Sequence, residues 1–99
     1  MKIYWTEEGL KRLDEIESYI SRDNPGVARE FINKILDKVE ILMNQPDIGR
    51  VVPELSIEKI REIIYKNYRI VYLVKAEHIE ILTVFEGHKQ LNREEIKTN

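Results

Sequence analysis

Residues 59–86 read KIREIIYKNYRIVYLVKAEHIEILTVFE and contain three runs of β-branched and aromatic residues. Two dipeptides, Lys66-Asn67 and Ala76-Glu77, separate these runs. Runs of this length, joined by short breaks, are typical of β-strands in hairpins. The stretch therefore predicts an antiparallel meander with strands over residues 59–65, 68–75 and 78–86.

Upstream of the meander, apolar residues recur at every third or fourth position, which is the period of a helix. Thr6 is a suitable N-cap for a first helix over about residues 7–22, and the sequence Asp23-Asn24-Pro25-Gly26 ends that helix. We expect Asn24 to cap a second helix that runs to about residue 44. The two helices predict an antiparallel helical hairpin.

These elements predict an α+β fold of order β-α-α-β-β-β in one domain that spans residues 1–99. The helical hairpin packs on one face of an antiparallel sheet, and the other face is open to solvent or to a partner. A chain of 99 residues supports one core, and its 15 Ile and 7 Val against 2 Ala favour a sheet within it. Residues 2–5 form the first strand, which must insert beside one of the last three.

The composition excludes several classes of protein. Without cysteine, the chain has no disulfides, no thiolate metal site and no cysteine nucleophile. Its two histidines, His78 and His88, show no metal-ligand spacing, so we expect neither a metal nor a cofactor. There is no signal peptide and no apolar run of membrane-spanning length, which predicts a cytoplasmic protein with no membrane partner. A net charge of −2 does not fit a generic binder of polyanions.

Candidate functional residues lie along the predicted sheet. Arg61 and Arg69 begin its first two long strands, and Glu86, His88 and Lys89 follow the third. Tyrosines are interleaved with them, and basic groups among aromatic rings bind phosphates and stack bases. The same residues also fit ordinary packing, with half-buried tyrosines and arginines paired to acids nearby.

The register of the first hairpin decides whether the two arginines form one site. If Lys66-Asn67 is a two-residue loop, Tyr65 faces Tyr68, and Arg61 and Arg69 lie on opposite faces. A three-residue loop places the two arginines on one face, where they form a joint anion site. The sequence leaves both registers open.

A loop of about 14 residues, from Asn44 to Ile57, precedes the meander. Loops of this length are uncommon in small domains and are often functional. Gly49 indicates a special backbone position, and Pro53 stiffens the approach to the sheet. Arg50 and Glu54 either project into a pocket that binds the target or form ion pairs that hold the loop in place.

The chain resembles the RelE/ParE superfamily, the toxins of type II toxin–antitoxin systems, over nearly its whole length. No single motif carries the resemblance, which rests on the order and spacing of several. They are Ile3-Tyr4-Trp5, the helix with Leu10, Leu13, Ile16 and Tyr19-Ile20, Gly49-Arg50-Val51-Val52-Pro53-Glu54, Ile60-Arg61-Glu62-Ile63-Ile64, Tyr68-Arg69-Ile70-Val71-Tyr72 and Ile81-Leu82-Thr83-Val84-Phe85-Glu86-Gly87-His88-Lys89.

The resemblance implies one of two activities. RelE-like members cleave messenger RNA on the ribosome without a metal, and ParE-like members inhibit DNA gyrase. In both branches a cognate antitoxin wraps the toxin and neutralises it, so we expect a hetero-oligomer with an antitoxin.

Carried over by position, Arg69 matches the central arginine of the ribonuclease members, and Lys89 falls where they keep an arginine. Arg61 lies near the place of their paired lysines, and His88 is a candidate proton shuttle. These four residues are therefore catalytic candidates under the ribonuclease alternative. Arg50, Glu54 and Glu86 are the candidates for target binding.

The sequence departs from the ribonuclease pattern. The residues beside Arg61 are Ile60 and Glu62, neither of them basic, and the C-terminal tyrosine is missing. A protein that docks into ribosomal RNA is also expected to be basic. We therefore expect a ParE-like toxin that arrests growth by inhibiting gyrase. A RelE-like endoribonuclease that acts on ribosome-bound mRNA is the alternative, and an inactive toxin homologue is the second alternative.

Overall fold

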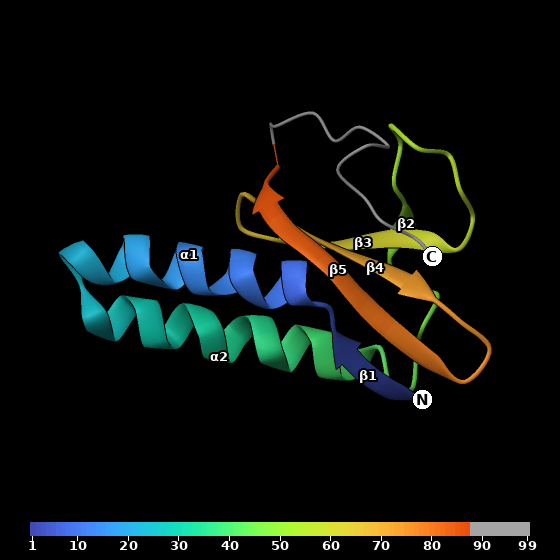
Figure 1. The fold of residues 1–99 in the computed structure, drawn as a ribbon, viewed down its shortest axis with the longest axis horizontal. Coiled ribbons are helices and arrows are strands. Elements are labelled where there is room, and N and C mark those ends of the chain that lie inside the picture. The colour runs from blue at the N-terminus through green and yellow to red at the C-terminus, as the bar shows by residue number, and fades with distance from the viewer. Residues whose placement is uncertain (88–99) are drawn as a thin grey trace.

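The computed structural model describes residues 1–87, and their fold is shown in Figure 1. Two helices form a hairpin on one face of a five-stranded sheet with the strand order β1-β5-β4-β3-β2. This confirms the α+β class and the packing of the hairpin. The elements in chain order are β1 (Lys2–Trp5), α1 (Glu7–Asp23), α2 (Pro25–Ile41), β2 (Arg50–Val51), β3 (Ile60–Tyr65), β4 (Tyr68–Val74) and β5 (His78–Glu86).

Both helices begin at the residues that their capping chemistry predicts. The Thr6 side chain accepts a hydrogen bond from the Gly9 amide at 3.0 Å. The Asn24 side chain accepts one from the Val27 amide at 3.1 Å, and Pro25 takes the first helical position, where no amide hydrogen is needed. Each cap satisfies an amide that the helix leaves without a partner.

The second helix ends at Ile41, three residues before its predicted end. The Leu42 amide bonds to the carbonyl of Val39 at 3.0 Å, and the next two amides also bond to carbonyls three residues back. These tighter bonds close the last turn and end the α-helical ladder. Leu42 is nevertheless fully buried, as the apolar face of the predicted helix requires. Within residues 1–87 no helix is long and apolar enough to cross a membrane.

The sheet is mixed, because β1 lies parallel to β5, with Ile3 opposite Ile79 and Trp5 opposite Ile81. The expected insertion of the first strand beside a late one is confirmed, but the expectation of a wholly antiparallel sheet is wrong. Tight turns fix the directions of β3, β4 and β5 only. The direction of β1 depends instead on Thr6, whose amide and hydroxyl both donate to the Ile81 carbonyl, at 3.1 and 2.9 Å.

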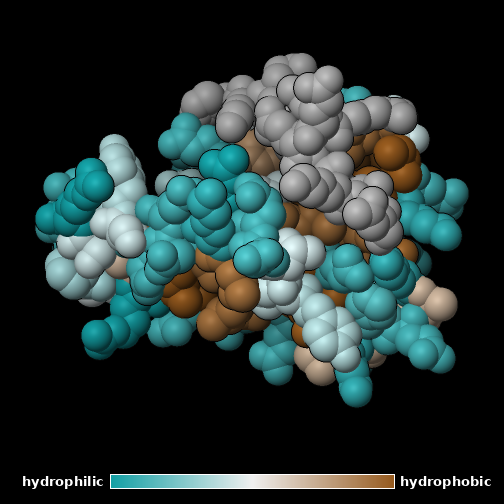
Figure 2. Space-filling view, viewed as in Figure 1, coloured by the Kyte–Doolittle hydropathy of each residue, from teal (hydrophilic) through white to brown (hydrophobic). Residues whose placement is uncertain are grey.

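The main core lies between the helical hairpin and the sheet. In Figure 2, hydrophobic side chains gather toward the middle of the face shown, where the hairpin meets the sheet, and hydrophilic ones cover the outer end of the hairpin. Burial of this apolar surface supplies most of the driving force for folding. The buried members of this core are Leu13, Phe31, Ile35, Val39, Leu42, Ile70, Tyr72, Ile79, Ile81 and Val84.

The opposite face of the sheet carries a second apolar cluster, so the expectation that this face is open to solvent or a partner is wrong for these positions. The loop before β3 contributes Val52 and Leu55, which are 0% and 2% exposed. They pack with residues of the sheet, and Ile57 adds partly buried surface. The loop therefore acts as a cover for this face. The sheet residues of the cluster are Ile60, Val71, Leu73, Leu82 and Phe85.

A β-bulge in β5 changes which residues of the strand face the helices. Val71 pairs with Thr83 while Tyr72 pairs with Ile81, so Leu82 is an extra residue. The bulge shifts the alternation of side chains along the strand. Before the bulge the odd-numbered Ile79 and Ile81 face the helices, and after it the even-numbered Val84 does.

Gly9 allows α1 to lie directly against β5. A Cβ atom at this position would be 2.6 Å from the Ile81 carbonyl oxygen. No side chain fits in that space without moving the helix or the strand.

We predict that Gly9→Ala destabilises the protein by about 1 to 3 kcal/mol through overpacking. This loss should appear although alanine is the better helix former by about 1 kcal/mol. Urea unfolding measures it. Gly26→Ala in α2 is the control, because its Cβ meets only the Asn24 side chain, at 3.3 Å. Equal or greater stability of Gly9→Ala would contradict the close approach.

Candidate functional site

The 46–55 loop wraps around the outer edge of the sheet and is held on both of its faces. Its two-residue strand β2 pairs with β3, with Arg50 opposite Glu62 and Val51 opposite Arg61. β2 was not expected from the sequence. Because successive residues of β3 point to opposite faces, Arg61 and Glu62 hold the loop from different sides.

On the helix side, Tyr72 fixes the beginning of the loop. Its fully buried hydroxyl accepts a hydrogen bond from the Gly49 amide at 3.0 Å and donates one to the Pro46 carbonyl at 2.8 Å. Arg61 donates to the Gly49 carbonyl at 2.9 Å, and its Nε lies 3.7 Å from an Asp47 carboxylate oxygen. Both backbone groups of Gly49 are therefore bonded to side chains of the sheet.

Position 49 must be glycine because the loop touches the sheet there. A Cβ atom would be 2.6 Å from the Glu62 carbonyl oxygen and 2.6 Å from the Tyr72 hydroxyl. The reason is close approach and not an unusual backbone angle, since Gly49 has no positive φ.

On the other face, Arg69 fixes the end of the loop. Its two terminal nitrogens donate to the two carboxylate oxygens of Glu54, both at 2.7 Å, and its Nε donates to Glu62 at 2.7 Å. Arg69 is 4% exposed and its guanidinium carbon lies 4.9 Å from the centre of the Phe85 ring. A two-pronged contact of this kind is among the strongest that an arginine makes with a carboxylate.

The network has balanced charge. Glu62 is 1% exposed, and its second carboxylate oxygen accepts a hydrogen bond from the Arg50 Nε at 2.7 Å. Two arginines thus meet two carboxylates, so no charge is buried without a counter-charge. The hydrogen bonds to Glu54 raise the pKa of Arg69 above its ordinary value against the opposing effect of burial. Arg69 therefore stays charged and bound.

Arg61 and Arg69 do not form a joint anion site. Tyr65 pairs with Tyr68 and Ile64 with Arg69, which is the register of a two-residue loop at Lys66-Asn67. In this register Arg61 and Arg69 point to opposite faces. The structure thus gives the alternative that separates them.

The tyrosines of the sheet are packing residues. Tyr65 and Tyr68 are half-buried, and both rings contact Phe31 of α2, with centroid distances of 5.9 and 5.0 Å. The ammonium groups of Lys38 and Lys66 lie 5.7 and 5.6 Å from the centre of the Tyr65 ring. The tyrosine rings that were candidates for base stacking therefore already pack against other side chains of the protein.

The remaining predicted site residues are not gathered around Arg69. Glu86 lies opposite Tyr68 at the end of β5 and, after burial, is the next cause that raises the pKa of that tyrosine. His88 and Lys89 lie outside the described residues. Glu54 and Arg50 form ion pairs with the sheet, which was one of the two interpretations of the loop.

Sequence reasoning offered nearby acids such as Glu62 as partners of the strand arginines but did not predict the central position of Glu62. Glu62 is the residue that joins Arg50 of the loop to Arg69 of β4. An acid between Ile60 and Ile64 on the face of a predicted strand is the signal that indicates a buried ion pair. The signal becomes usable only when the register of the hairpin is known.

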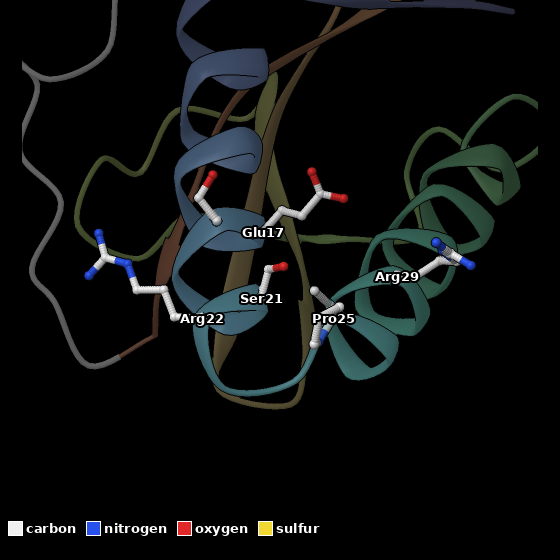
Figure 3. A pocket seen from close by; sticks show the side chains of 7 residues that line it. Glu17, Ser21, Arg22, Pro25 and Arg29 are labelled. Carbon is white, nitrogen blue, oxygen red and sulfur yellow. The ribbon is translucent and has the colours of Figure 1, made fainter.

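A hollow of about 460 Å³ at the tip of the helical hairpin does not have the geometry of an anion site. In Figure 3 the side chains of Arg22 and Arg29 lie on opposite sides of it and point apart. Glu17 adds a carboxylate to the lining. Within residues 1–87 no group of three or more acids and histidines is arranged to hold a metal ion.

Comparisons with known proteins point to one family. A family model described as the ParE toxin of the type II toxin–antitoxin system parDE matches residues 3–91. The chain is 36% identical over 91 residues to a Sinorhizobium fredii (strain NBRC 101917 / NGR234) protein named "Putative toxin Y4kP", and the match covers 90% of this chain and 91% of that protein. A chain of the solved chromosomal ParDE system from P. aeruginosa has the same fold, with a TM-score of 0.72, 22% identity, and coverage of 87% of this chain and 95% of that chain.

We predict that Arg69→Ala costs about 3 to 5 kcal/mol of stability, because it leaves the buried Glu62 without one of its counter-charges. Arg12→Ala is a matched control. Arg12 also contacts two carboxylates, but its side chain is 41% exposed on α1, and such pairs contribute at most about 1 kcal/mol. Denaturant unfolding compares the variants. Similar losses for both would show that the Arg69 pairs do not hold the loop.

We also predict that Tyr72→Phe costs about 1 to 3 kcal/mol at neutral pH, because the buried Gly49 amide loses its acceptor. Tyr19→Phe, at a side chain that is 67% exposed, should change nothing measurable.

Burial raises the pKa of Tyr72 above its ordinary value of 10.0. The contribution of the neutral Tyr72 hydroxyl to the free energy of unfolding is therefore complete below pH 10 and is lost as the pH rises above that value. Unfolding measured against pH should show a smaller alkaline loss in Tyr72→Phe, and an equal loss would exclude Tyr72 as a source.

Proposed function

Because the chain belongs to the ParE toxin family of type II toxin–antitoxin systems, we propose that it arrests growth by binding and inhibiting DNA gyrase. A cognate antitoxin neutralises it by forming a complex with it. In this account the protein acts by binding another protein and not by cleaving a nucleic acid.

The observation that carries the proposal is the state of Arg69. Its position is the one that the resemblance assigned to the phosphate-binding arginine of the ribonuclease branch. Here Arg69 is 4% exposed, and both of its terminal nitrogens and its Nε already donate to carboxylates. A phosphate would have to displace Glu54 and enter beside Glu62, against the repulsion of a buried negative charge.

The overall charge supports the same proposal. A net charge of −2 gives no long-range attraction to RNA, since binding to polyanions depends on many lysines and arginines that contact phosphates. A protein target carries no such requirement.

A time course after induction of the toxin without its antitoxin tests the proposal. We expect DNA synthesis to fall first, followed by a DNA-damage response, while protein synthesis falls later. The purified protein should also block DNA supercoiling by gyrase in vitro, and prior addition of the antitoxin should restore it.

Two other results would contradict the proposal and identify its alternatives. An early fall in protein synthesis, with cleavage of ribosome-bound messages, would establish the RelE-like activity. Unchanged growth with soluble, folded protein present would establish an inactive toxin homologue. Co-expression with the antitoxin is the control in each arm.

A further inference from the structure

An apolar hollow of about 300 Å³ lies beside β2, between the outer edge of β3 and the end of α2. Three isoleucines in its lining are unusually exposed: Ile41, Ile48 and Ile64 keep 46%, 55% and 46% of their surface in solvent. They come from α2, the 46–55 loop and β3. Apolar groups gathered in this way on a small protein mark a surface that binds a partner.

The hollow adjoins an unpaired stretch of backbone. The strand β2 covers only Arg61 and Glu62, and no other strand among residues 1–87 pairs with this side of β3. The Val52 amide donates to the Ile60 carbonyl, so the even-numbered residues of β3 direct their backbone groups to the outer edge. Ile64 is therefore the next position at which an added strand would find both an N–H and a C=O.

The rim of the hollow is positively charged. Lys38 lines it, and Arg50 keeps 59% of its side chain exposed although its Nε is bonded to Glu62. The acid in the lining is Glu62 itself, whose carboxylate is already bound by Arg50 and Arg69. A partner segment therefore needs acidic groups to match this rim.

We infer that an extended segment of the antitoxin, with both apolar and acidic residues, adds to the outer edge of β3 beyond β2. Its backbone pairs with Ile64, its apolar side chains cover Ile41 and Ile48, and its acids meet Lys38 and Arg50. Strand addition of this kind takes affinity from backbone hydrogen bonds and specificity from alternate side chains. The inference rests on the proposed antitoxin partnership and names the surface that it uses.

A second copy of this chain is a poorer occupant. Two copies joined edge to edge through this surface bring the basic rim of one copy, with Lys38 and Arg50, toward the basic rim of the other, since a symmetric interface repeats its own patch. The repulsion between like charges opposes that arrangement.

The test uses the full chain and its cognate antitoxin. Hydrogen exchange should show the Ile64 amide exchanging fast in the free chain and slowly in the complex. Lys38→Glu and Ile48→Asp should each weaken the complex about tenfold or more. Their matched controls are Lys11→Glu and Leu10→Asp on α1, since Leu10 is 53% exposed and Ile48 is 55% exposed. The controls should bind like the parent chain.

The outcomes separate this inference from the proposed partnership. One outcome is that the complex forms, that both variants bind normally, and that the Ile64 amide stays unprotected. In that case the antitoxin docks elsewhere, so the inference is wrong while the partnership stands. If the Ile64 amide becomes protected in the chain alone as its concentration rises, a second copy occupies the edge. If the parent chain and the antitoxin form no complex, both the partnership and the inference fail.

Discussion

The structure depends on the charge of Arg69, which sits in the sheet almost out of contact with water. An arginine in such a place is stable only with carboxylates in hydrogen-bonding distance. One comes from β3, as Glu62, and the other from the preceding loop, as Glu54. Because the loop supplies half of this compensation, its position is fixed by electrostatics as well as by packing.

The same loop then completes the rest of the fold. It brings Val52 and Leu55 over the face of the sheet that the helices leave uncovered, and it forms the short edge strand β2. On the helix side, Tyr72 and Arg61 hold its other end through the backbone of Gly49. Arg61, Arg69 and Tyr72, which were among the residues that suggested nucleic-acid chemistry, thus attach the loop to the sheet, and this favours a function through protein contacts.

Local chemistry explains which parts of the fold could be predicted. Thr6 and Asn24 cap the helices as expected, and the boundaries of β3, β4 and β5 lie within one residue of their predicted positions, because capping and side-chain period are read from neighbouring residues. The direction of β1 depends on bonds between Thr6 and Ile81, far apart in the chain, and no local pattern encodes it. β2 and the cover of the second face depend likewise on pairing between the loop and β3.

The site follows the same rule. The ion pairs of Arg50 and Glu54 were one of two open interpretations, and the separation of Arg61 from Arg69 was one of two open registers. The pairing of Tyr65 with Tyr68 decides between the two registers, and it also places Glu62 on the same face as Arg69, where the two form an ion pair. The family was the firmest conclusion from the sequence, since the order of many weak motifs along the chain does not require a register, and the family comparison confirms it.

The most direct test of this account is nitrogen NMR of the Arg69 side chain, observed at its Nε–H group while RNA is added. The account predicts a signal that exchanges slowly with water, because Nε–H is bonded to the buried Glu62, and that does not move as RNA is added. The exposed Arg12 gives the fast-exchanging reference within the same spectrum. An Arg69 signal that exchanges as fast as that of Arg12 and shifts with RNA would show a free, phosphate-binding guanidinium and contradict the account.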